Sequence, residues 1–182
     1  MAIMKGMHFS PPPLLALDAF LAGREFDAGT ALVVLGEVQD PHNVGAIIRS
    51  AAAFGVSAVL LPERRQAPIT EVVERASAGA VRDIPLISIG NVNQALLTLK
   101  EKGFWIYGLA GEGDHSLSGE HFDAPAAFVL GNEGEGLREK TREQCDIVLS
   151  IPIHSRVESL NVSNAAAVAL YAWSVQHTEA LS

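Results

Sequence analysis

Hydrophobic and polar residues follow two alternating patterns along this 182-residue chain from residue 30 onward. Short runs of consecutive apolar residues predict buried strands, and apolar residues three and four positions apart predict amphipathic helices. The predicted strands are 31–35, 58–61, 84–89, 105–109, 127–130 and 147–151, and the predicted helices are 43–54, 70–78, 92–102, 137–144 and 162–175. Apolar strands that alternate with helices predict an α/β fold, with a mainly parallel sheet and helices on both of its faces.

The first 29 residues have a different pattern. Pro11, Pro12 and Pro13 interrupt regular structure, and residues 14–22 predict a short amphipathic helix that ends near Gly23. We therefore expect residues 1–29 to form an N-terminal linker or edge helix outside the core, and residues 30–182 to form the main domain.

Composition and charge exclude several classes of protein. No run of about 18 apolar residues is present, which argues against a membrane-spanning helix, and the N-terminal residues lack the pattern of a secretory signal. Cys145 is the only cysteine, so an intrachain disulfide is impossible and a Cys/His metal site is not expected. These features predict a cytoplasmic protein. The net charge of −8 argues against a protein that wraps nucleic acid over a broad basic surface.

Parallel sheets bind ligands in the loops beyond the carboxyl ends of their strands, and three such loops carry candidate chemistry. The first, residues 38–45, leads into the predicted helix that carries Arg49. We expect Asn43 to cap this helix and Gly55 to end it. Arg49 shares a helix face with Gly45 and several alanines, so a phosphate could approach its guanidinium closely. A solvated surface arginine remains the alternative.

The second loop contains Gly131, Gly134 and Gly136 directly after a predicted buried strand. Three glycines in six residues indicate unusual backbone dihedral angles or the close approach of a ligand. The loop has neither the Lys-Ser/Thr pair of a P-loop nor the dinucleotide-binding pattern of glycines. Glu133 and Glu135 disfavour a phosphate and favour a neutral or cationic ligand, such as the sulfonium of S-adenosylmethionine.

The third loop places small polar side chains before the predicted C-terminal helix. Ser159, Asn161, Ser163 and Asn164 fall within six positions. Asn161 or Ser163 can cap the helix, but one cap needs only one of them. The remaining hydroxyl and amide groups suggest that this loop orients a substrate or catalytic groups.

Taken in order, these three loops resemble the three motifs of the SpoU (TrmH) family, within the SPOUT RNA 2′-O-ribose methyltransferases. The resemblance runs from about residue 32 to residue 175. Residues 105–115 and 143–146 are most similar to the branch that methylates a guanosine of bacterial 23S rRNA. The resemblance implies S-adenosylmethionine as cofactor, RNA as partner, a homodimer, and a deep trefoil knot in the C-terminal part of the fold.

The resemblance also implies a set of site residues and no metal. The cofactor-binding residues would be Leu109, Ala110, Gly111, Gly131, Ile151 and Leu160, and the catalytic residues would be Arg49, Asn43, Glu133, Ser159 and Asn161. The family arginine has been given the role of general base, but a guanidinium has a pKa above about 12 and is hard to deprotonate. We therefore expect Arg49 to bind the neighbouring phosphate and to stabilise the developing 2′-alkoxide.

Other functions fit part of the pattern. A tRNA substrate is the nearest alternative, because the motifs are shared, and a non-catalytic knotted factor for RNA binding or ribosome assembly is another. A nucleotide-dependent oxidoreductase is disfavoured by the missing phosphate loop. Relatives that act on the ribosome carry an N-terminal RNA-binding domain, whereas only about 30 residues precede the core here. The sequence is therefore expected to be either a catalytic domain cut from a longer protein or a minimal enzyme. In the first case another domain supplies the grip on RNA. Close relatives often have a small residue at the position of Asn132, which is the second departure from the family pattern.

Overall fold

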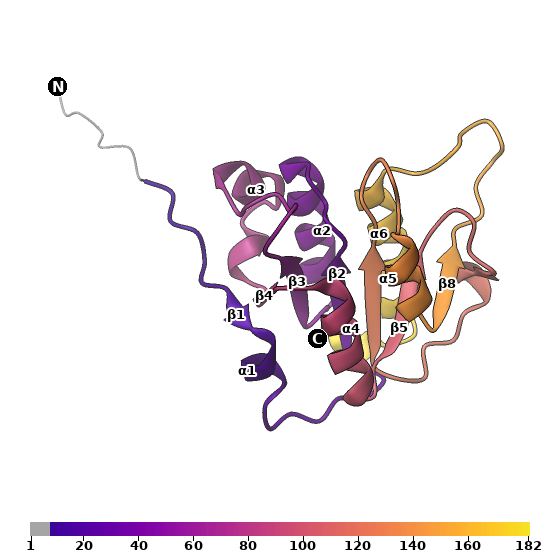
Figure 1. Cartoon of the computed structure of the whole chain (residues 1–182), viewed down its shortest axis with the longest axis horizontal. Helices are drawn as coiled ribbons and strands as arrows, with labels where there is room; N and C mark the ends of the chain where they lie inside the picture. The colour runs from indigo at the N-terminus through magenta and orange to yellow at the C-terminus, as the bar shows by residue number, and fades with distance from the viewer. Residues whose placement is uncertain (1–7) are drawn as a thin grey trace.

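A computed structural model describes residues 8–182, so the first seven residues of the predicted 1–29 segment lie outside the described residues. One sheet of eight parallel strands runs through the molecule in the order β1-β4-β3-β2-β7-β5-β8-β6 (Figure 1). The strands are β1 (Leu15–Ala16), β2 (Ala31–Leu35), β3 (Ala58–Pro62), β4 (Leu86–Ile89), β5 (Trp105–Leu109), β6 (His115–Ser116), β7 (Ala126–Leu130) and β8 (Ile147–Ser150).

Helices cover both faces of this sheet, which confirms the predicted α/β architecture. One face packs against α2 (Pro41–Ala53), α3 (Glu71–Ala76) and α6 (Val162–Ser174), and the other against α1 (Leu17–Leu21), α4 (Val92–Glu101) and α5 (Glu139–Gln144). Three short 3₁₀ helices complete the fold: η1 (Ala80–Arg82), η2 (Leu117–Gly119) and η3 (Thr178–Leu181).

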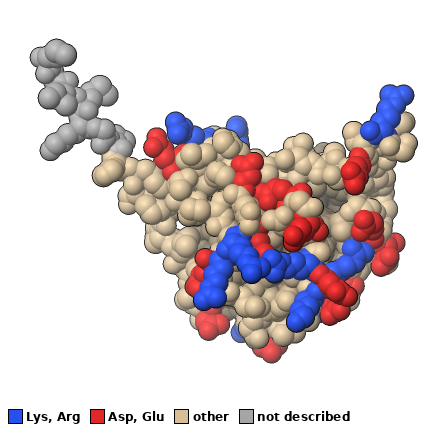
Figure 2. All heavy atoms as spheres, turned by 45° about the horizontal axis from the view of Figure 1, so that its top comes forward, with Lys and Arg blue, Asp and Glu red and all other residues tan. Residues whose placement is uncertain are grey.

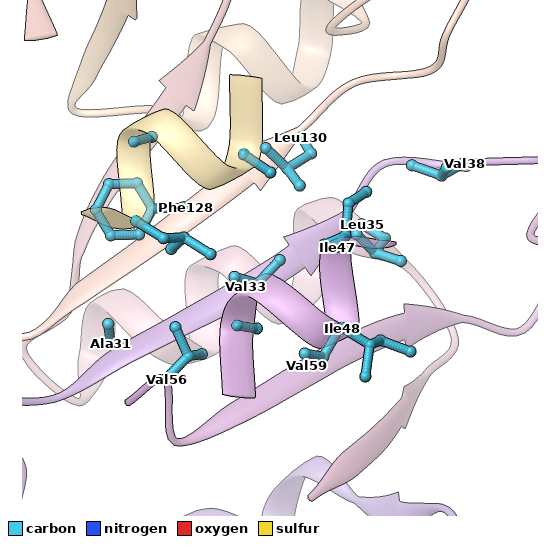
Figure 3. Packing of buried hydrophobic residues seen from close by; sticks show 14 of the residues in the cluster. Ala31, Val33, Leu35, Val38, Ile47, Ile48, Val56, Val59, Phe128 and Leu130 are labelled. Atoms are coloured by element: carbon cyan, nitrogen blue, oxygen red, sulfur yellow. The ribbon is translucent and has the colours of Figure 1, made fainter. Parts of the chain in front are cut away.

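The central strand β2 shows why consecutive apolar residues are needed. Its five residues are all fully buried, because alternate side chains point to opposite faces of the sheet and each face is covered by helices. Val33 and Leu35 pack with residues of α2 such as Ile47 (Figure 3), whereas Leu32 and Val34 lie in the core on the other face. Removal of this apolar surface from water on both faces stabilises the sheet and fixes where its loops emerge.

The N-terminal segment is more closely integrated than we expected. Leu15 of β1 pairs with Ile87 of β4 and extends the sheet by one strand. Phe20 and Leu21 are each 2% exposed and belong to the second core, so the expectation that this segment lies outside the core is wrong for these two residues. The helix lies within the predicted range 14–22, whereas a two-residue strand is too short to produce a recognisable period in the sequence.

The small residues on α2 serve packing as well. A Cβ atom on Gly45 would overlap the Cβ of Ala76 and would lie 2.9 Å from the carbonyl oxygen of Val73. Glycine therefore allows α2 and α3 to approach closely. The helix surface at Gly45 is therefore buried against protein, whereas Arg49, one turn later, is exposed.

Two further features are absent from residues 8–182. No helix in this range is both long and apolar enough to cross a membrane. The same residues include no group of three or more His, Cys, Asp or Glu side chains placed to hold a metal ion.

Candidate functional site

A cavity of about 390 Å³ opens at the carboxyl ends of β5, β7 and β8. All six residues that the sequence suggested for cofactor binding line this cavity: Leu109, Ala110, Gly111, Gly131, Ile151 and Leu160. Glu133 and Ser159 line it as well. Its volume falls in the range of small-molecule sites. The structure therefore brings together segments that lie up to 51 positions apart in the sequence.

The lining of this cavity combines aliphatic and acidic side chains. Glu112, Glu133, Glu135 and Glu158 contribute four carboxylates, whereas Arg142 contributes the only guanidinium. The Arg142 guanidinium donates a hydrogen bond of 2.9 Å to the carbonyl oxygen of Glu112. An excess of carboxylates favours a ligand with positive charge. Figure 2, which turns the top of Figure 1 forward, shows acidic and basic side chains interspersed, without one broad basic surface.

A chain of hydrogen bonds joins the three candidate loops. The side-chain amide of Asn161 donates to Asn43 Oδ1 at 3.0 Å, and the amide of Asn43 donates to Glu133 Oε1 at 3.4 Å. Glu133 also accepts from the backbone N–H groups of Asp40 at 2.9 Å and Gln39 at 3.2 Å. We call this series the Glu133–Asn43–Asn161 chain. It fixes the relative positions of the loops that surround the cavity.

Asn161 has a second task at the start of α6. Its Oδ1 accepts hydrogen bonds from the backbone N–H groups of Ser163 at 2.8 Å and Asn164 at 3.4 Å. Asn161 is therefore the N-cap of this helix, one of the two residues proposed for that role. Because the side-chain oxygen of Asn161 accepts the cap hydrogen bonds, its side-chain nitrogen must be the donor to Asn43. Asn43 in turn donates to Glu133, so all donors in the Glu133–Asn43–Asn161 chain point toward Glu133.

The expectation that Asn43 caps α2 is wrong. Asp40 is the N-cap, with its carboxylate accepting from the backbone N–H of His42 at 2.8 Å, and Pro41 is the first helical residue. Asn43 instead lies within the first turn and is only 8% exposed. An Asp followed by Pro is a recognised signal for a helix start, so the sequence contained the information.

The carboxyl group of Glu133 is held in its ionised form. Burial alone would raise its pKa, but hydrogen bonds outweigh this effect: the backbone N–H groups of Asp40, of Glu133 itself and of Gln39, and the side chain of Asn43. The result is a pKa below the usual value for glutamate. Since both carboxylate oxygens accept bonds from the first loop, we interpret Glu133 as a positioning residue.

The glycine loop closes on itself. A Cβ on Gly131 would overlap the backbone of Gly136, and Gly136 has a left-handed φ of 67°. Asn132 and Gly136 exchange backbone hydrogen bonds of 3.0 and 2.9 Å. The Asn132 side chain accepts from the N–H of Gly134 and donates to the carbonyl oxygen of Glu37, each at 2.9 Å. Asn132, whose role the sequence left open, therefore shapes this loop.

Two predicted residues stand apart from the hydrogen-bonded chain. Arg49 is exposed on α2, does not line the cavity, and forms no hydrogen bond or ion pair with any part of the chain that the structure describes. Ser159 lines the cavity but likewise has no hydrogen-bond partner within residues 8–182.

The sequence pattern did not indicate one further residue, Gln66. Its side-chain oxygen accepts a hydrogen bond from the N–H of Val38 at 3.0 Å, and its side-chain nitrogen donates one to the carbonyl oxygen of Val38 at 2.7 Å, so Gln66 anchors the first loop. A polar residue 28 positions away gives no local signal of such a contact.

These features define an α/β protein with an all-parallel sheet and a small-molecule cavity at the carboxyl edge of its strands. Residues 30–171 match the model of the SpoU rRNA Methylase family. The chain belongs to the SpoU rRNA methylase family.

Relatives in bacteria share nearly half of the aligned residues. The 23S rRNA (guanosine-2′-O-)-methyltransferase RlmB of Xanthomonas axonopodis pv. citri is 47% identical over 148 residues, which cover 81% of this chain and 59% of that protein. RlmB of Yersinia pestis is 46% identical over 140 residues, which cover 77% of this chain and 57% of that protein. The chain thus spans less than two thirds of the length of these relatives.

Solved structures support the same family. The SpoU methyltransferase AviRb from Streptomyces viridochromogenes, in complex with the cofactor AdoMet, has a TM-score of 0.79 and 25% identity, and the match covers 92% of this chain and 66% of that one. A structure described as giving insights into the 2-OH methylation of C/U34 on tRNA has a TM-score of 0.73 and 25% identity. That match covers 84% of this chain and 99% of the other.

Glu133→Gln should destabilise the protein in a pH-dependent way. In the variant, the side-chain NH₂ group of glutamine would replace one of the two oxygens that accept hydrogen bonds from the backbone N–H groups of the first loop. We expect this loss to lower the unfolding free energy by about 1 kcal/mol at pH 7. A carboxyl group whose folded pKa is lowered contributes stability above its unfolded pKa, and this contribution is lost as the pH falls through its folded pKa. The gap between wild type and variant should therefore narrow below about pH 4.

Urea denaturation at pH 7 and at pH 3.5 measures this gap. Glu135→Gln is the matched control, since Glu135 lies in the same loop and its side chain accepts no hydrogen bond within residues 8–182. A gap for Glu133→Gln that stays constant with pH would contradict the assigned role.

Proposed function

We propose that this chain transfers a methyl group from S-adenosylmethionine to the ribose 2′-hydroxyl of a guanosine in 23S rRNA. The observation that carries the proposal is that the second and third family motifs line one cavity, while the Glu133–Asn43–Asn161 chain joins the first motif to them. The similarity to RlmB proteins supports the guanosine of 23S rRNA as the target.

The residues around the cavity fit the proposed cofactor. Aliphatic side chains such as Leu109, Ile151 and Leu160 can enclose an adenine ring, and the excess of carboxylates suits a sulfonium and an ammonium group. AviRb, which holds AdoMet, supports the same assignment. When bound, the cofactor supplies a methyl group that is already activated by the positive charge on sulfur.

The residues of this chain would then supply position and charge. We assign Arg49 to the phosphate beside the target ribose and to the developing 2′-alkoxide, where its fixed positive charge is most useful. Ser159, which lines the cavity without a partner in residues 8–182, is assigned to the ribose or the cofactor. Asn43 and Asn161 keep the loops in register, so that the hydroxyl meets the methyl group in line.

We also infer the homodimer and the trefoil knot that family membership implies. An exposed apolar stripe along α6 and its C-cap supports the dimer: Val168, Tyr171 and the C-cap Val175 are 42%, 58% and 49% exposed at positions that share one helix face. Because α6 packs beside α2, a partner on this stripe would lie near Arg49. The knot would involve the exposed loop of residues 151–160, which leads from β8 to α6.

Val168→Asp should separate the dimer, because a carboxylate would be buried at the interface without a partner. Sedimentation velocity should give a dimer for the wild type and a monomer for the variant. Leu97→Asp is the matched control, since Leu97 is also 42% exposed but lies on α4, across the sheet. A wild type that sediments as a monomer at micromolar concentration would refute this inference.

A tRNA substrate is the second candidate. The structure concerned with C/U34 methylation on tRNA matches this chain over 99% of its own length. The match to the RlmB proteins, by contrast, covers 57% to 59% of their length. If 23S rRNA is the substrate, we still predict that an RNA-binding domain outside this sequence contributes to binding, and that the protein is cytoplasmic.

Methyl transfer from tritiated S-adenosylmethionine to unmodified 23S rRNA and, separately, to unmodified tRNA tests the proposal. We expect incorporation into 23S rRNA at a guanosine ribose, located by nuclease mapping. Incorporation only into tRNA would support the second candidate. Cofactor binding without transfer to either RNA would favour a non-catalytic RNA-binding factor.

Arg49→Ala should reduce the transfer rate by at least about a thousandfold, the size expected for loss of a group that stabilises transition-state charge. Cofactor affinity should change little, because Arg49 does not line the cavity. Arg75→Ala is the control, as Arg75 is an exposed arginine on the neighbouring helix α3. Near-normal transfer by Arg49→Ala would remove Arg49 from the mechanism, whether as base or as stabiliser.

A further inference from the structure

A second cavity, of about 290 Å³, lies on the other side of the glycine loop. It is formed at the carboxyl ends of β2, β3 and β4 and shares Gly131, Gly136 and Leu137 with the first cavity. We call it the arginine pocket, after its lining residues Arg64, Arg65 and Arg138. The function proposed above does not use it.

The charges in this pocket leave two guanidinium groups unneutralised. Arg138 pairs with Glu37, the only acidic residue in the lining, at a distance of 2.6 Å. Arg64 and Arg65 are exposed and form no hydrogen bond or ion pair with residues 8–182. In a chain with a net charge of −8, two neighbouring unpaired arginines at one cavity favour an anionic ligand.

The backbone at this pocket is held in an uncommon conformation. Glu37 and Arg65 have φ values of 66° and 57°, and they are two of the three non-glycine residues with positive φ within residues 8–182. Such conformations persist where the surrounding structure enforces them, and they gather at functional sites. Next to Arg65, the Gln66 side chain accepts a hydrogen bond from the N–H of Val38 and donates one to the carbonyl oxygen of Val38, which ties this backbone to the first loop.

The same contacts connect the pocket to the proposed active site. Val38 leads directly to Gln39 and Asp40, whose N–H groups donate to Glu133. From the other side, the Asn132 side chain donates to the carbonyl oxygen of Glu37. The backbone that carries Arg64 and Arg65 is thus tied to the loops around the methyl-transfer site.

The start of α4 adds to the positive potential. Val92 and Asn93 of its first turn line the pocket, and the Asn91 side chain caps the helix by accepting from the N–H of Gln94. The N-terminal end of this ten-residue helix carries a partial positive charge. Arginines remain the main feature, and the helix supplements them.

We propose that the arginine pocket binds a backbone phosphate of the substrate RNA, from a nucleotide that flanks the methylated one, with Arg64 and Arg65 as its ligands. This inference rests on the proposed function. It also addresses the acidic net charge of the chain: a few arginines at defined places around the site can direct an RNA strand without a broad basic surface.

The double variant Arg64→Ala/Arg65→Ala tests the proposal. Its affinity for unmodified 23S rRNA transcript, measured by filter binding between 50 and 300 mM salt, should fall. The slope of log affinity against log salt should become shallower by about 0.7 to 0.9, which corresponds to one lost phosphate contact. In the transfer assay the KM for RNA should rise at least about tenfold while kcat stays within about twofold.

Arg24→Ala/Lys102→Ala is the matched control. It removes the same charge from the opposite edge of the sheet, where Arg24 follows α1 and Lys102 ends α4. A salt slope for the pocket variant that equals that of this control would overturn the proposal. So would a loss of S-adenosylmethionine binding in calorimetry, because the arginines would then belong to the cofactor cavity.

Two further outcomes separate the RNA proposal from its alternatives. If guanosine 5′-monophosphate binds the wild type and the pocket variant loses this binding without a change in its RNA salt slope, the pocket holds a free nucleotide and the proposal is wrong. If the wild type transfers no methyl group but its RNA salt slope still depends on Arg64 and Arg65, the proposed function fails while the phosphate site stands.

Discussion

The ionised carboxylate of Glu133 is the contact on which the site depends. This carboxylate projects from the glycine loop and accepts hydrogen bonds from two backbone N–H groups of the first loop and from the side-chain amide of Asn43. The side-chain oxygen of Asn43 in turn accepts a hydrogen bond from the amide of Asn161. Hydrogen bonds to an ionised acceptor are stronger than neutral ones, and here they replace water around a charge at the rim of a cavity. One side chain thus aligns three loops that are distant in sequence.

This arrangement explains why the loops contain their particular residues. Both the oxygen and the nitrogen of each side-chain amide form hydrogen bonds. The Asn161 oxygen caps α6 and its nitrogen donates to the Asn43 oxygen, and the Asn43 nitrogen donates to Glu133. The glycine at position 131 is required by the close approach of the loop to itself. Polar side chains that the sequence suggested as direct catalysts therefore also build the framework that holds a ligand.

Periodicity predicted most of the strands and helices because both faces of the sheet are covered, so each buried strand is a continuous apolar run. It missed the edge strands β1 and β6, which have two residues each and expose much of their surface. Gly131 was marked by the glycine loop, but the other five cofactor residues could be placed only through the family resemblance, since no local pattern marks Leu109 or Ile151. The cap at Asp40 was readable from Asp-Pro, whereas the Gln66 contact to Val38 depends on tertiary structure.

Arg49 lies outside the hydrogen-bonded chain and does not line the first cavity. Its position on the exposed face of α2, beside α6, is consistent with a site completed by RNA or by a second subunit. The arginine pocket lies across the glycine loop from the cofactor cavity, and the two cavities share loop residues. Chemistry and RNA positioning would then depend on the same small loop, whose shape Asn132 and Glu133 maintain.

The central claim is that the Glu133–Asn43–Asn161 chain assembles the cofactor cavity. Asn161→Asp isolates it, because aspartate retains the α6 cap but presents an acceptor to Asn43 Oδ1. Calorimetric titration with S-adenosylmethionine should show affinity reduced at least about tenfold, or about 1.4 kcal/mol. Asn164→Asp, in the same turn, should bind like the wild type. Wild-type affinity in Asn161→Asp, with the helix content unchanged, would contradict the account.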